Sequence, residues 1–404
     1  MMTMDSLELM RNLAQPSPGK IILLVLDGLG GLPHPDTGKT ELETADTPNL
    51  NRLAKEGMTG LIDIVSPGIT PGSAAGHLAL FGYDPLRFII GRGALEAVGT
   101  DFDLKPGDVA ARGNFCTADK NGLITDRRAG RITNEECARL CKLLDGMTID
   151  NIGLFVRPVR EHRFIVVFRG DGLNPAVSDS DPQQLGILPK DVSALQPGAA
   201  KTASVTKKFI AQAKRILAGQ HPANMLLLRG FSERPDFPAM TEIYKLKPAA
   251  IAVYPMYRGL ARLVGMDIMD PSTGLEDELK ALKANYSAYD FFFLHVKGTD
   301  SAGEDGDFER KVRVIEELDR ALPELIDTGS DVLIVTGDHS TPALLKGHSW
   351  HPVPLLLHSR WCRPDRATEF GESACACGGL GRFPATQIMP LAMAHALKLI
   401  KFGA

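Results

Sequence analysis

Apolar runs of strand length alternate with helical patterns at both ends of this 404-residue chain. Residues 21–27 (IILLVLD) form a short, continuous apolar run, which is typical of a buried strand. Residues 47–58 have the spacing of a helix, with Thr47 as its cap and Pro48 at its first position. Late in the chain the same alternation predicts strands at 291–296, 331–340 and 352–359 and helices at 308–326 and 389–400. This order of elements indicates an α/β fold with a mostly parallel sheet flanked by helices.

The middle of the chain has a different pattern. It carries more arginine, more turns and shorter strands, such as the one expected at 163–170, and a helix at 207–219 precedes a further strand at 224–230. We therefore predict a discontinuous architecture. One α/β domain is made of residues 18–87 and 241–404, and a smaller α+β domain, residues 88–240, is inserted between its halves.

Composition excludes several classes of protein. The net charge is -4 and aromatic residues make up 6% of the chain, which argues against a nucleic-acid partner. No apolar run reaches the roughly 20 residues that a membrane-spanning helix needs, and the first residues lack the apolar core of a secretory signal. Six cysteines lack the spacing of a disulfide scaffold or a zinc site. We expect a cytoplasmic protein with reduced thiols and no membrane or nucleic-acid partner.

Side chains that can bind metals follow the predicted strands. In open α/β sheets, ligands bind beyond the carboxyl ends of the strands. The candidates there, together with a serine and a histidine in the loop GITPGSAAGHLALFGYDP, are Asp27, Ser73, His77, Asp300, Glu304, Asp305, Asp307, Asp338, His339, His348 and His351. Aspartate and histidine suit Zn²⁺ or Mn²⁺, and two such ions roughly 3.5–4 Å apart can hold a phosphoryl group.

Each of these residues also has a purely structural interpretation. Asp27 precedes glycines and could form a turn. The segment 338–342 could cap the next element, and Ser73 could cap a helix. Single histidines such as His348 and His351 are more often ordinary surface or core residues. The coherence of the whole set favours a metal site.

Six stretches occur here in the order expected of one family. They are VLDGLGG, TPNLNRLAKEG, PGSAAGHLALFGYDP, HVKGTDSAGEDGDFERKV, VTGDHSTP and HSWHPVP. They resemble the cofactor-independent phosphoglycerate mutases of the shorter archaeal type, within the alkaline phosphatase superfamily. The resemblance runs from about residue 20 to the C-terminus. It implies an alkaline-phosphatase-like sheet and an isomerase of glycolysis and gluconeogenesis. The implied reaction interconverts 3-phosphoglycerate and 2-phosphoglycerate through a phosphoserine, without 2,3-bisphosphoglycerate.

The resemblance also implies the roles of individual residues. Ser73 matches the phosphorylated residue. The implied ligands of one metal are Asp27, Ser73, Asp338 and His339, and those of the other are Asp300, Glu304 and His348. His348 is preferred to His351 because the family's histidine stands four residues before the first proline of PVP. The family has AGHD where this chain has AGED, so we expect Glu304 to favour Mn²⁺ or Mg²⁺ over Zn²⁺; Co²⁺ is a further option.

Basic residues are expected to bind the carboxylate and the phosphate of the substrate. The candidates are Arg127, Arg128, Arg131, His162, Arg163, Arg229, Lys247 and Arg258. Lys247 resembles the family's lysine in its phosphate pocket, and Asp126 is the candidate that moves protons at the two substrate hydroxyls. A solvated basic face is the structural alternative.

Other functions stay open at this point. One rival is a phosphatase or another phosphomutase, and a second is a binding protein without activity. A homo-oligomer is also an open possibility.

Overall fold

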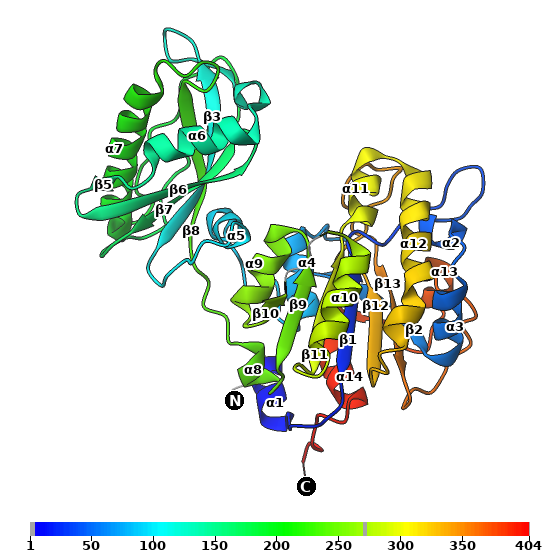
Figure 1. Cartoon of the computed structure of the whole chain (residues 1–404). Coiled ribbons are helices and arrows are strands. Elements are labelled where there is room, and N and C mark those ends of the chain that lie inside the picture. The colour runs from blue at the N-terminus through cyan, green and yellow to red at the C-terminus, as the bar shows by residue number, and fades with distance from the viewer. Residues whose placement is uncertain (1–4, 270–272, 404) are drawn as a thin grey trace. The chain divides into compact units, whose positions relative to one another are not determined.

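The computed structural model describes residues 5–269 and 273–403 (Figure 1). The chain divides into two compact units: unit 1 is Met1–Ile89 with Phe237–Ala404, and unit 2 is Ile90–Asp236. Unit 1 is therefore built from two separate stretches of sequence. The sequence prediction placed the corresponding boundaries after residues 87 and 240.

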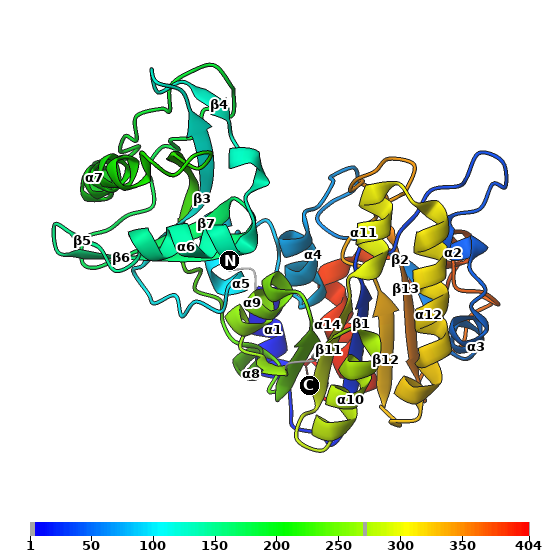
Figure 2. The ribbon, with the colours of Figure 1, turned by 45° about the horizontal axis from the view of Figure 1, so that its top comes forward.

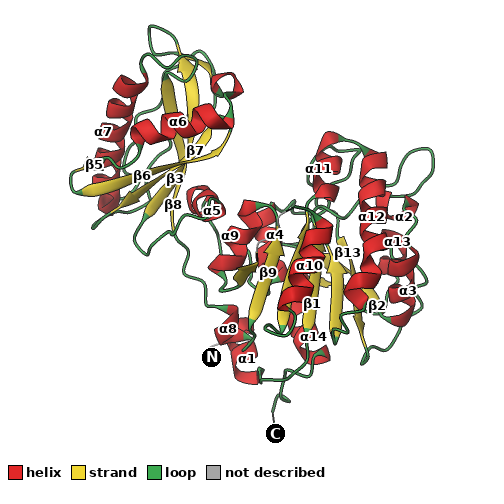
Figure 3. Ribbon diagram, viewed as in Figure 1, coloured by secondary structure: helices red, strands yellow, loops and turns green. Residues whose placement is uncertain are grey.

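Unit 1 is built on an eight-stranded sheet in the order β10-β9-β11-β1-β12-β13-β2-β14 (Figure 3). In that order the strands are Asp267–Met269, Pro248–Ala252, Phe291–Val296, Ile21–Leu26, Val332–Thr336, Val353–Ser359, Met58–Asp63 and Gly381–Pro384. Strand β13 runs antiparallel to both of its neighbours, and the other described pairs are parallel. The predicted mostly parallel α/β sheet is confirmed.

Strand β1 lies between β11 and β12, and all six of its residues are buried. A parallel strand covered on both faces needs apolar side chains at every position, which explains the unbroken run IILLVL. In the register of the three strands, Leu26 pairs with Val296, and Val25 pairs with Thr336. The residues that follow these strands therefore emerge at one edge of the sheet.

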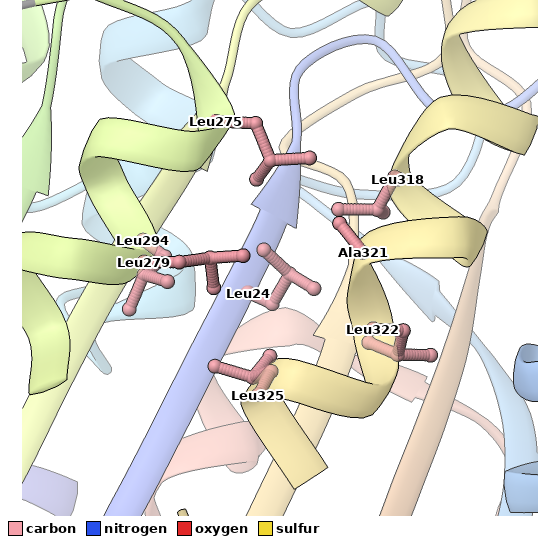
Figure 4. Close-up of a pocket in the computed structure, with 8 residues that line it drawn as sticks. All are labelled: Leu24, Leu275, Leu279, Leu294, Leu318, Ala321, Leu322 and Leu325. Carbon is pink, nitrogen blue, oxygen red and sulfur yellow. The ribbon is translucent and has the colours of Figure 1, made fainter. Parts of the chain in front are cut away.

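Helices cover both faces of this sheet, with α10 and α12 on one face and α4 and α14 on the other (Figure 2). The helices of unit 1 are α1 (Ser6–Leu13), α2 (Glu41–Thr44), α3 (Pro48–Glu56), α4 (Ser73–Leu80), α8 (Met240–Ile243), α9 (Pro255–Leu263), α10 (Leu275–Asn285), α11 (Gly298–Asp305), α12 (Phe308–Ile326), α13 (Glu372–Ala376) and α14 (Ile388–His395). Figure 4 shows Leu24 of β1 among the leucines of α10 and α12. None of the described helices is long and apolar enough to span a membrane.

Two predicted helices differ in detail from the observed ones. Thr47 is the N-cap residue of α3, but its side chain makes no capping bond. The carboxylate of Asp319 on α12 accepts from the amides of Asn49 and Leu50 instead, at 3.2 and 2.7 Å. The last helix was predicted too long: it ends at His395, and Leu397 has a positive φ of 55°, which turns the chain away.

Unit 2 is an α+β structure with a six-stranded antiparallel sheet (Figure 3). Its strands are β3 (Val109–Ala118), β4 (Ile124–Asp126), β5 (Thr148–Ile149), β6 (Ile152–Arg160), β7 (Arg163–Arg169) and β8 (Met225–Glu233). Its helices are α5 (Arg92–Gly99), α6 (Asn134–Leu144) and α7 (Ala200–Leu217), with short 3₁₀ turns at Ala129–Arg131 and Pro197–Ala199. The predicted helix at 207–219 is thus the later part of α7. All six cysteines of the chain are unpaired.

The two faces of the unit 2 sheet differ in chemistry. Val109, Ala111 and Phe115 of β3 pack into the apolar core together with residues of α6 and α7. Alternate residues of a strand point to opposite faces, so Arg112 belongs to the other face. Helix α5 packs there: the backbone of Ala110 lies directly against Gly93 of α5.

Candidate active site

Two sets of candidate metal ligands lie beyond the carboxyl ends of β1, β11 and β12. Ligand atoms of Asp27, Asp338 and His339 lie within 4.8 Å of one another, and so do those of Asp300, His339 and His348. Asp27 follows β1, Asp338 and His339 follow β12, and Asp300 lies in the first turn of α11, directly after β11. His348 is half-buried and the other four are buried. The structure therefore brings these five predicted residues together beyond the carboxyl ends of the strands, where ligands bind in open α/β sheets.

The first set has the electrostatics of a cation site. Asp27 Oδ1 and Asp338 Oδ2 are buried and have no hydrogen-bond partner in the described part of the chain. The Nε2 atom of His339 lies 3.2 Å from the first oxygen and 3.3 Å from the second. Although burial lowers the pKa of His339, the carboxylates of Asp338 and Asp27 outweigh it and hold the pKa above its ordinary value. Positive charge is stabilised at this point, and these residues fit a divalent cation.

Hydrogen bonds fix which nitrogen of His339 faces the first set. Thr341 Oγ1 donates to Asp300 Oδ1 at 2.7 Å, which uses its proton. The hydroxyl oxygen then accepts from His339 Nδ1–H at 2.9 Å. A neutral imidazole has a single lone-pair nitrogen, so Nε2 carries it and points at Asp27 and Asp338. His339 can therefore complete the first set but not both sets at once.

The second set is less complete. His348 Nδ1–H donates to the carbonyl of Pro71 at 3.0 Å, which leaves Nε2 facing Asp300 Oδ1 at 3.6 Å. Glu304 lies one turn after Asp300 on α11, but its side chain is exposed and it is in neither set. The second set therefore has two close protein ligands of its own, Asp300 and His348.

Ser73 is the first residue of α4 and is half-buried. Its hydroxyl lies 3.2 Å from His339 Nε2. Gly72 occupies the N-cap position, so Ser73 does not cap the helix with its side chain. The helix approaches the ligands closely, because a Cβ at Gly76 would lie 2.2 Å from the backbone oxygen of Asp338. Ser73 thus presents its hydroxyl to the first ligand set at a helix N-terminus, a position that favours a phosphate.

The sequence analysis missed three residues beside Asp27, one of which is the buried His295, with its Nε2 3.2 Å from Asp27 Oδ2. Lys297 Nζ lies 3.0 Å from Asp27 Oδ2 and 2.5 Å from Asp300 Oδ2, so it bridges the two sets. Burial alone would lower its pKa, but Asp27 and Asp300 raise it above its ordinary value. Tyr257 on α9 donates its hydroxyl to Asp27 Oδ2. The spacing KGTD, which places Lys297 one helical turn before Asp300, could have indicated this lysine.

Unit 2 carries a cluster of arginines on the α5 face of its sheet. Arg112 pairs in register with Arg229, and Asn114 with Arg163, so these side chains share one face. The Nε atoms of Arg112, Arg163 and Arg229 are buried without a hydrogen-bond partner among the described residues.

Little negative charge balances this cluster. Arg112 is 3% exposed and its Nη1 lies 2.9 Å from Glu96 Oε1. Burial, with neighbouring arginines, lowers the pKa of Arg112 to about 10. Arg112 was not predicted from the sequence, whereas Arg163 and Arg229 were. Buried, unpartnered guanidinium N–H groups fit an anion.

The other predicted residues of unit 2 have varied surroundings. Arg127 forms a two-bond fork with Asp181, at 3.1 and 2.6 Å. His162 is buried next to Arg163, whereas Arg128 and Arg131 are exposed.

Asp126 has a local structural task. Its two carboxylate oxygens accept from the amides of Arg128 and Gly130, at 2.7 and 2.6 Å. The carboxylate therefore shapes the turn that follows β4. Its predicted part in proton transfer stays a prediction.

The structure does not bring Lys247 to the candidate site. Lys247 directly precedes β9, which is parallel to β11, and it therefore lies at the amino edge of the sheet. The ligand sets follow the carboxyl ends of the strands, at the opposite edge. Its ammonium lies over the ring of Tyr289, 5.1 Å from the centroid. Arg258 lies on α9 beside Tyr257.

The fold and the site define an α/β protein with a candidate nucleophile beside buried groups that could hold a cation. A family model described as 2,3-bisphosphoglycerate-independent phosphoglycerate mutase matches residues 54–224. A Thermus thermophilus protein named "probable 2,3-bisphosphoglycerate-independent phosphoglycerate mutase" is 51% identical, covering 99% of this chain and 100% of its own. An Aquifex aeolicus protein of the same name is 50% identical, with 98% and 100% covered. The chain belongs to this family of isomerases, which confirms the resemblance found in the sequence.

Solved structures agree with this assignment. The cofactor-independent phosphoglycerate mutase from Thermoplasma acidophilum has a TM-score of 0.74 and 32% identity, covering 93% of this chain and 100% of its own. The PH0037 protein from Pyrococcus horikoshii has a TM-score of 0.82 and 32% identity, with 97% and 100% covered.

Proposed function

We propose that this chain interconverts 3-phosphoglycerate and 2-phosphoglycerate through a phosphoserine at Ser73, with two divalent cations and without 2,3-bisphosphoglycerate. One observation carries the proposal: the Ser73 hydroxyl lies 3.2 Å from the lone-pair nitrogen of His339, beside two unpartnered carboxylate oxygens. A hydroxyl beside a cation site at a helix N-terminus suits a nucleophile for phosphoryl transfer.

Asp27, Ser73, Asp338 and His339 would hold one cation, and Asp300, His348 and Glu304 the other. Bound there, divalent cations lower the pKa of the serine hydroxyl and neutralise charge on the phosphoryl oxygens. We propose Mn²⁺, with Mg²⁺, Co²⁺ or Zn²⁺ as alternatives, because Glu304 adds a hard oxygen ligand where the family's pattern has histidine. For that, the exposed Glu304 side chain has to turn toward Asp300.

The protein's own residues carry the transfer. Ser73 Oγ loses its proton and attacks the phosphorus of 3-phosphoglycerate in line, the bond from phosphorus to the substrate's O3 breaks, and the proton passes to O3. The ammonium of Lys297 lies close enough to Asp27 and Asp300 to stabilise negative charge on the transferring group. The glycerate then turns, its 2-hydroxyl loses its proton and attacks the phosphorus of the phosphoserine, and the bond from phosphorus to Ser73 Oγ breaks. Oγ takes up the proton, and 2-phosphoglycerate is formed. Ser73 stores the phosphoryl group between the two steps, so no bisphosphorylated cofactor is needed.

The arginine cluster of unit 2 is proposed to bind the substrate. The guanidinium groups of Arg112, Arg163 and Arg229, whose Nε atoms have no hydrogen-bond partner among the described residues, can donate to a carboxylate or a phosphate in a bidentate way. Holding the glycerate between the two transfers requires such an anchor, because a released glycerate would leave the phosphoserine to hydrolysis.

The test uses metal-stripped protein and 3-phosphoglycerate, with Mn²⁺, Mg²⁺, Co²⁺ or Zn²⁺ added in turn and no 2,3-bisphosphoglycerate. We expect metal-dependent 2-phosphoglycerate with little free phosphate, and a phosphorylated peptide containing Ser73 by mass spectrometry after acid quench. S73A should lose both signals, with kcat falling by on the order of 10³-fold or more. S287A, which changes an exposed serine, is the control. Free phosphate as the main product would instead make the chain a phosphatase, and an active S73A would refute the phosphoserine.

A further inference from the structure

Lys311 on α12 has no exposed surface, which is rare for lysine. Its Nζ donates to the backbone oxygens of Gly30 and Thr341, both at 3.0 Å. Gly30 lies in the loop that follows Asp27. Thr341 lies in the loop that follows His339. One buried ammonium therefore ties together the two loops that carry the first ligand set.

Two carboxylates also bond to these loops: Glu41, which is buried, to both of them, and Glu372, which is half-buried, to the first. Glu41 on α2 accepts from the amide of Ala343 at 2.8 Å and from that of Leu32 at 3.3 Å. One of its oxygens lies 3.9 Å from Lys311 Nζ. Glu372 on α13 accepts from the amide of Gly31 at 2.8 Å. Lys311, Glu41 and Glu372 thus bond to the two loops, and they are here named the buried ion cluster after the fully buried Lys311 and Glu41.

The sequence of the first loop, GLGG, follows from this close packing. A Cβ on Gly30 would lie 1.9 Å from Ser340 Oγ. A Cβ on Gly31 would lie 2.0 Å from Glu41 Oε2. Side chains at these positions would push the loops apart, so the glycines allow the approach and the buried ion cluster holds it.

We propose that Lys311 is a positioning residue of the active site: with Glu41 and Glu372 it holds the loop 28–32 against the loop 340–343, so that Asp27 and His339 face one point before a cation arrives. This inference rests on the proposed metal site and goes beyond it, because none of the three residues reaches the ligand atoms. Groups that orient metal ligands typically change metal affinity by 10–100-fold when removed.

The chain offers a matched control for Lys311. Lys398 is 1% exposed, and its Nζ donates to the backbone oxygen of Ser17 at 2.6 Å and to Asp290 at 3.2 Å. Ser17 and Asp290 precede β1 and β11, so Lys398 lies at the other edge of the sheet. Replacing either lysine by methionine removes one buried charge and its hydrogen bonds, to two backbone oxygens for Lys311 and to one backbone oxygen and a carboxylate for Lys398. Only the change at Lys311 affects the ligand loops.

The experiment measures Mn²⁺ binding by calorimetry and the melting temperature by scanning calorimetry, on metal-stripped full-length protein. K311M and K398M should both melt at lower temperature. Only K311M should also bind Mn²⁺ more weakly, by roughly 10–100-fold. The double variant K311M/E41Q restores the charge balance but not the bonds to Gly30 and Thr341. Its Mn²⁺ affinity should therefore be as low as that of K311M.

Three results would overturn the inference. They are wild-type Mn²⁺ affinity in folded K311M, recovery of affinity in K311M/E41Q, and an equal loss of affinity in K398M. If K311M does not fold, E372Q replaces it: it lowers Mn²⁺ affinity if the inference is right and leaves it unchanged if it is wrong. A wild-type protein that binds no divalent cation would refute the proposed function as well, whereas the other outcomes leave that proposal standing.

Discussion

Unit 1 and unit 2 both bury polar atoms that lack hydrogen-bond partners in the described part of the chain, and charged groups of opposite sign are among them. In unit 1 they include the carboxylate oxygens Asp27 Oδ1 and Asp338 Oδ2. In unit 2 they include the guanidinium Nε atoms of Arg112, Arg163 and Arg229. A buried charged group without a partner is costly, and it persists where a ligand supplies the missing charge. The described ligand set of unit 1 is thus suited to cations, and the arginine cluster of unit 2 is suited to anions.

The largest effect is expected from a substitution in the first ligand set of unit 1. D338N keeps the shape of the side chain but removes its charge, so the first ligand set loses an anion. We expect Mn²⁺ binding to be lost and kcat/KM to fall by about 10³-fold, which corresponds to several kcal/mol. D331N, at the amino edge of the sheet where Asp331 accepts from the amide of Lys20, is the control. Normal Mn²⁺ binding by D338N would contradict the proposal that the first ligand set of unit 1 binds a cation.

A smaller effect is expected from a substitution in the arginine cluster of unit 2. R112M should raise KM for 3-phosphoglycerate by roughly 10–100-fold, because a hydrogen bond to a charged group contributes about 1.5–3 kcal/mol. Mn²⁺ affinity should not change, and R112K should recover little because it lacks the planar fork. R139M removes an exposed arginine of the same unit and serves as the control. An altered Mn²⁺ affinity in R112M, or an unaltered KM, would contradict the idea that unit 1 binds cations and unit 2 binds the anionic substrate.

The two charge environments also move histidine pKa values in opposite directions. The pKa of His339 is raised beside the carboxylates of unit 1, whereas burial and Arg163 lower the pKa of His162 in unit 2 to about 4. Between pH 4 and the unfolded value of about 6.5, the unfolded state binds the proton and the folded state does not, so stability rises with pH. Below this window the lowered pKa of His162 reduces the free energy of unfolding by up to about 3 kcal/mol, since one pKa unit corresponds to about 1.4 kcal/mol. H162Q should flatten the dependence of the free energy of unfolding on pH in this window, measured by urea titration; an unchanged slope would show that His162 is not buried neutral.

The smallest effect concerns the choice of cation. E304H places an imidazole one turn after Asp300, and we expect Zn²⁺ affinity to rise severalfold relative to Mn²⁺ because imidazole suits Zn²⁺. E309Q, which changes another acidic residue near the start of α12, is the control. The ratio of Zn²⁺ to Mn²⁺ affinity is measured by calorimetry with the two ions in competition, in E304H and in the wild type. An unchanged preference would mean that residue 304 stays outside the second ligand set.

Much of unit 1 could be predicted from the sequence. The bounds of β11 and α12 match the expected 291–296 and 308–326, because continuous apolar runs and amphipathic spacing are strong local signals. The rule that ligands gather at strand ends also placed Asp27 and His339 at one edge. Lys247 was assigned from its resemblance to the family's lysine and not from a strand, because the short, alanine-rich β9 (PAAIA) was not recognised in the sequence; in the structure Lys247 lies at the amino edge of the sheet.

Other site residues depend on contacts that no local pattern carries. Arg112 lies in the segment VAARGNF, which has no distinctive pattern. It becomes part of a candidate anion site only because Arg163 and Arg229, on two other strands, share its face of the sheet. Lys311 occupies a helix position whose burial depends on loops far away in sequence. These residues act through tertiary packing, so they become visible only once the chain is folded.

The interruption of unit 1 by unit 2 has a consequence for synthesis. Strand β1 is made early, but its two neighbours, β11 and β12, leave the ribosome only after all of unit 2 has been made. Unit 2 is continuous in sequence and can fold as soon as it emerges, since domains generally fold as units during translation. The fully apolar strand IILLVL has to wait without partners throughout that time. The order of translation therefore makes the substrate-binding candidate the first part of the enzyme to fold and the cation site the last.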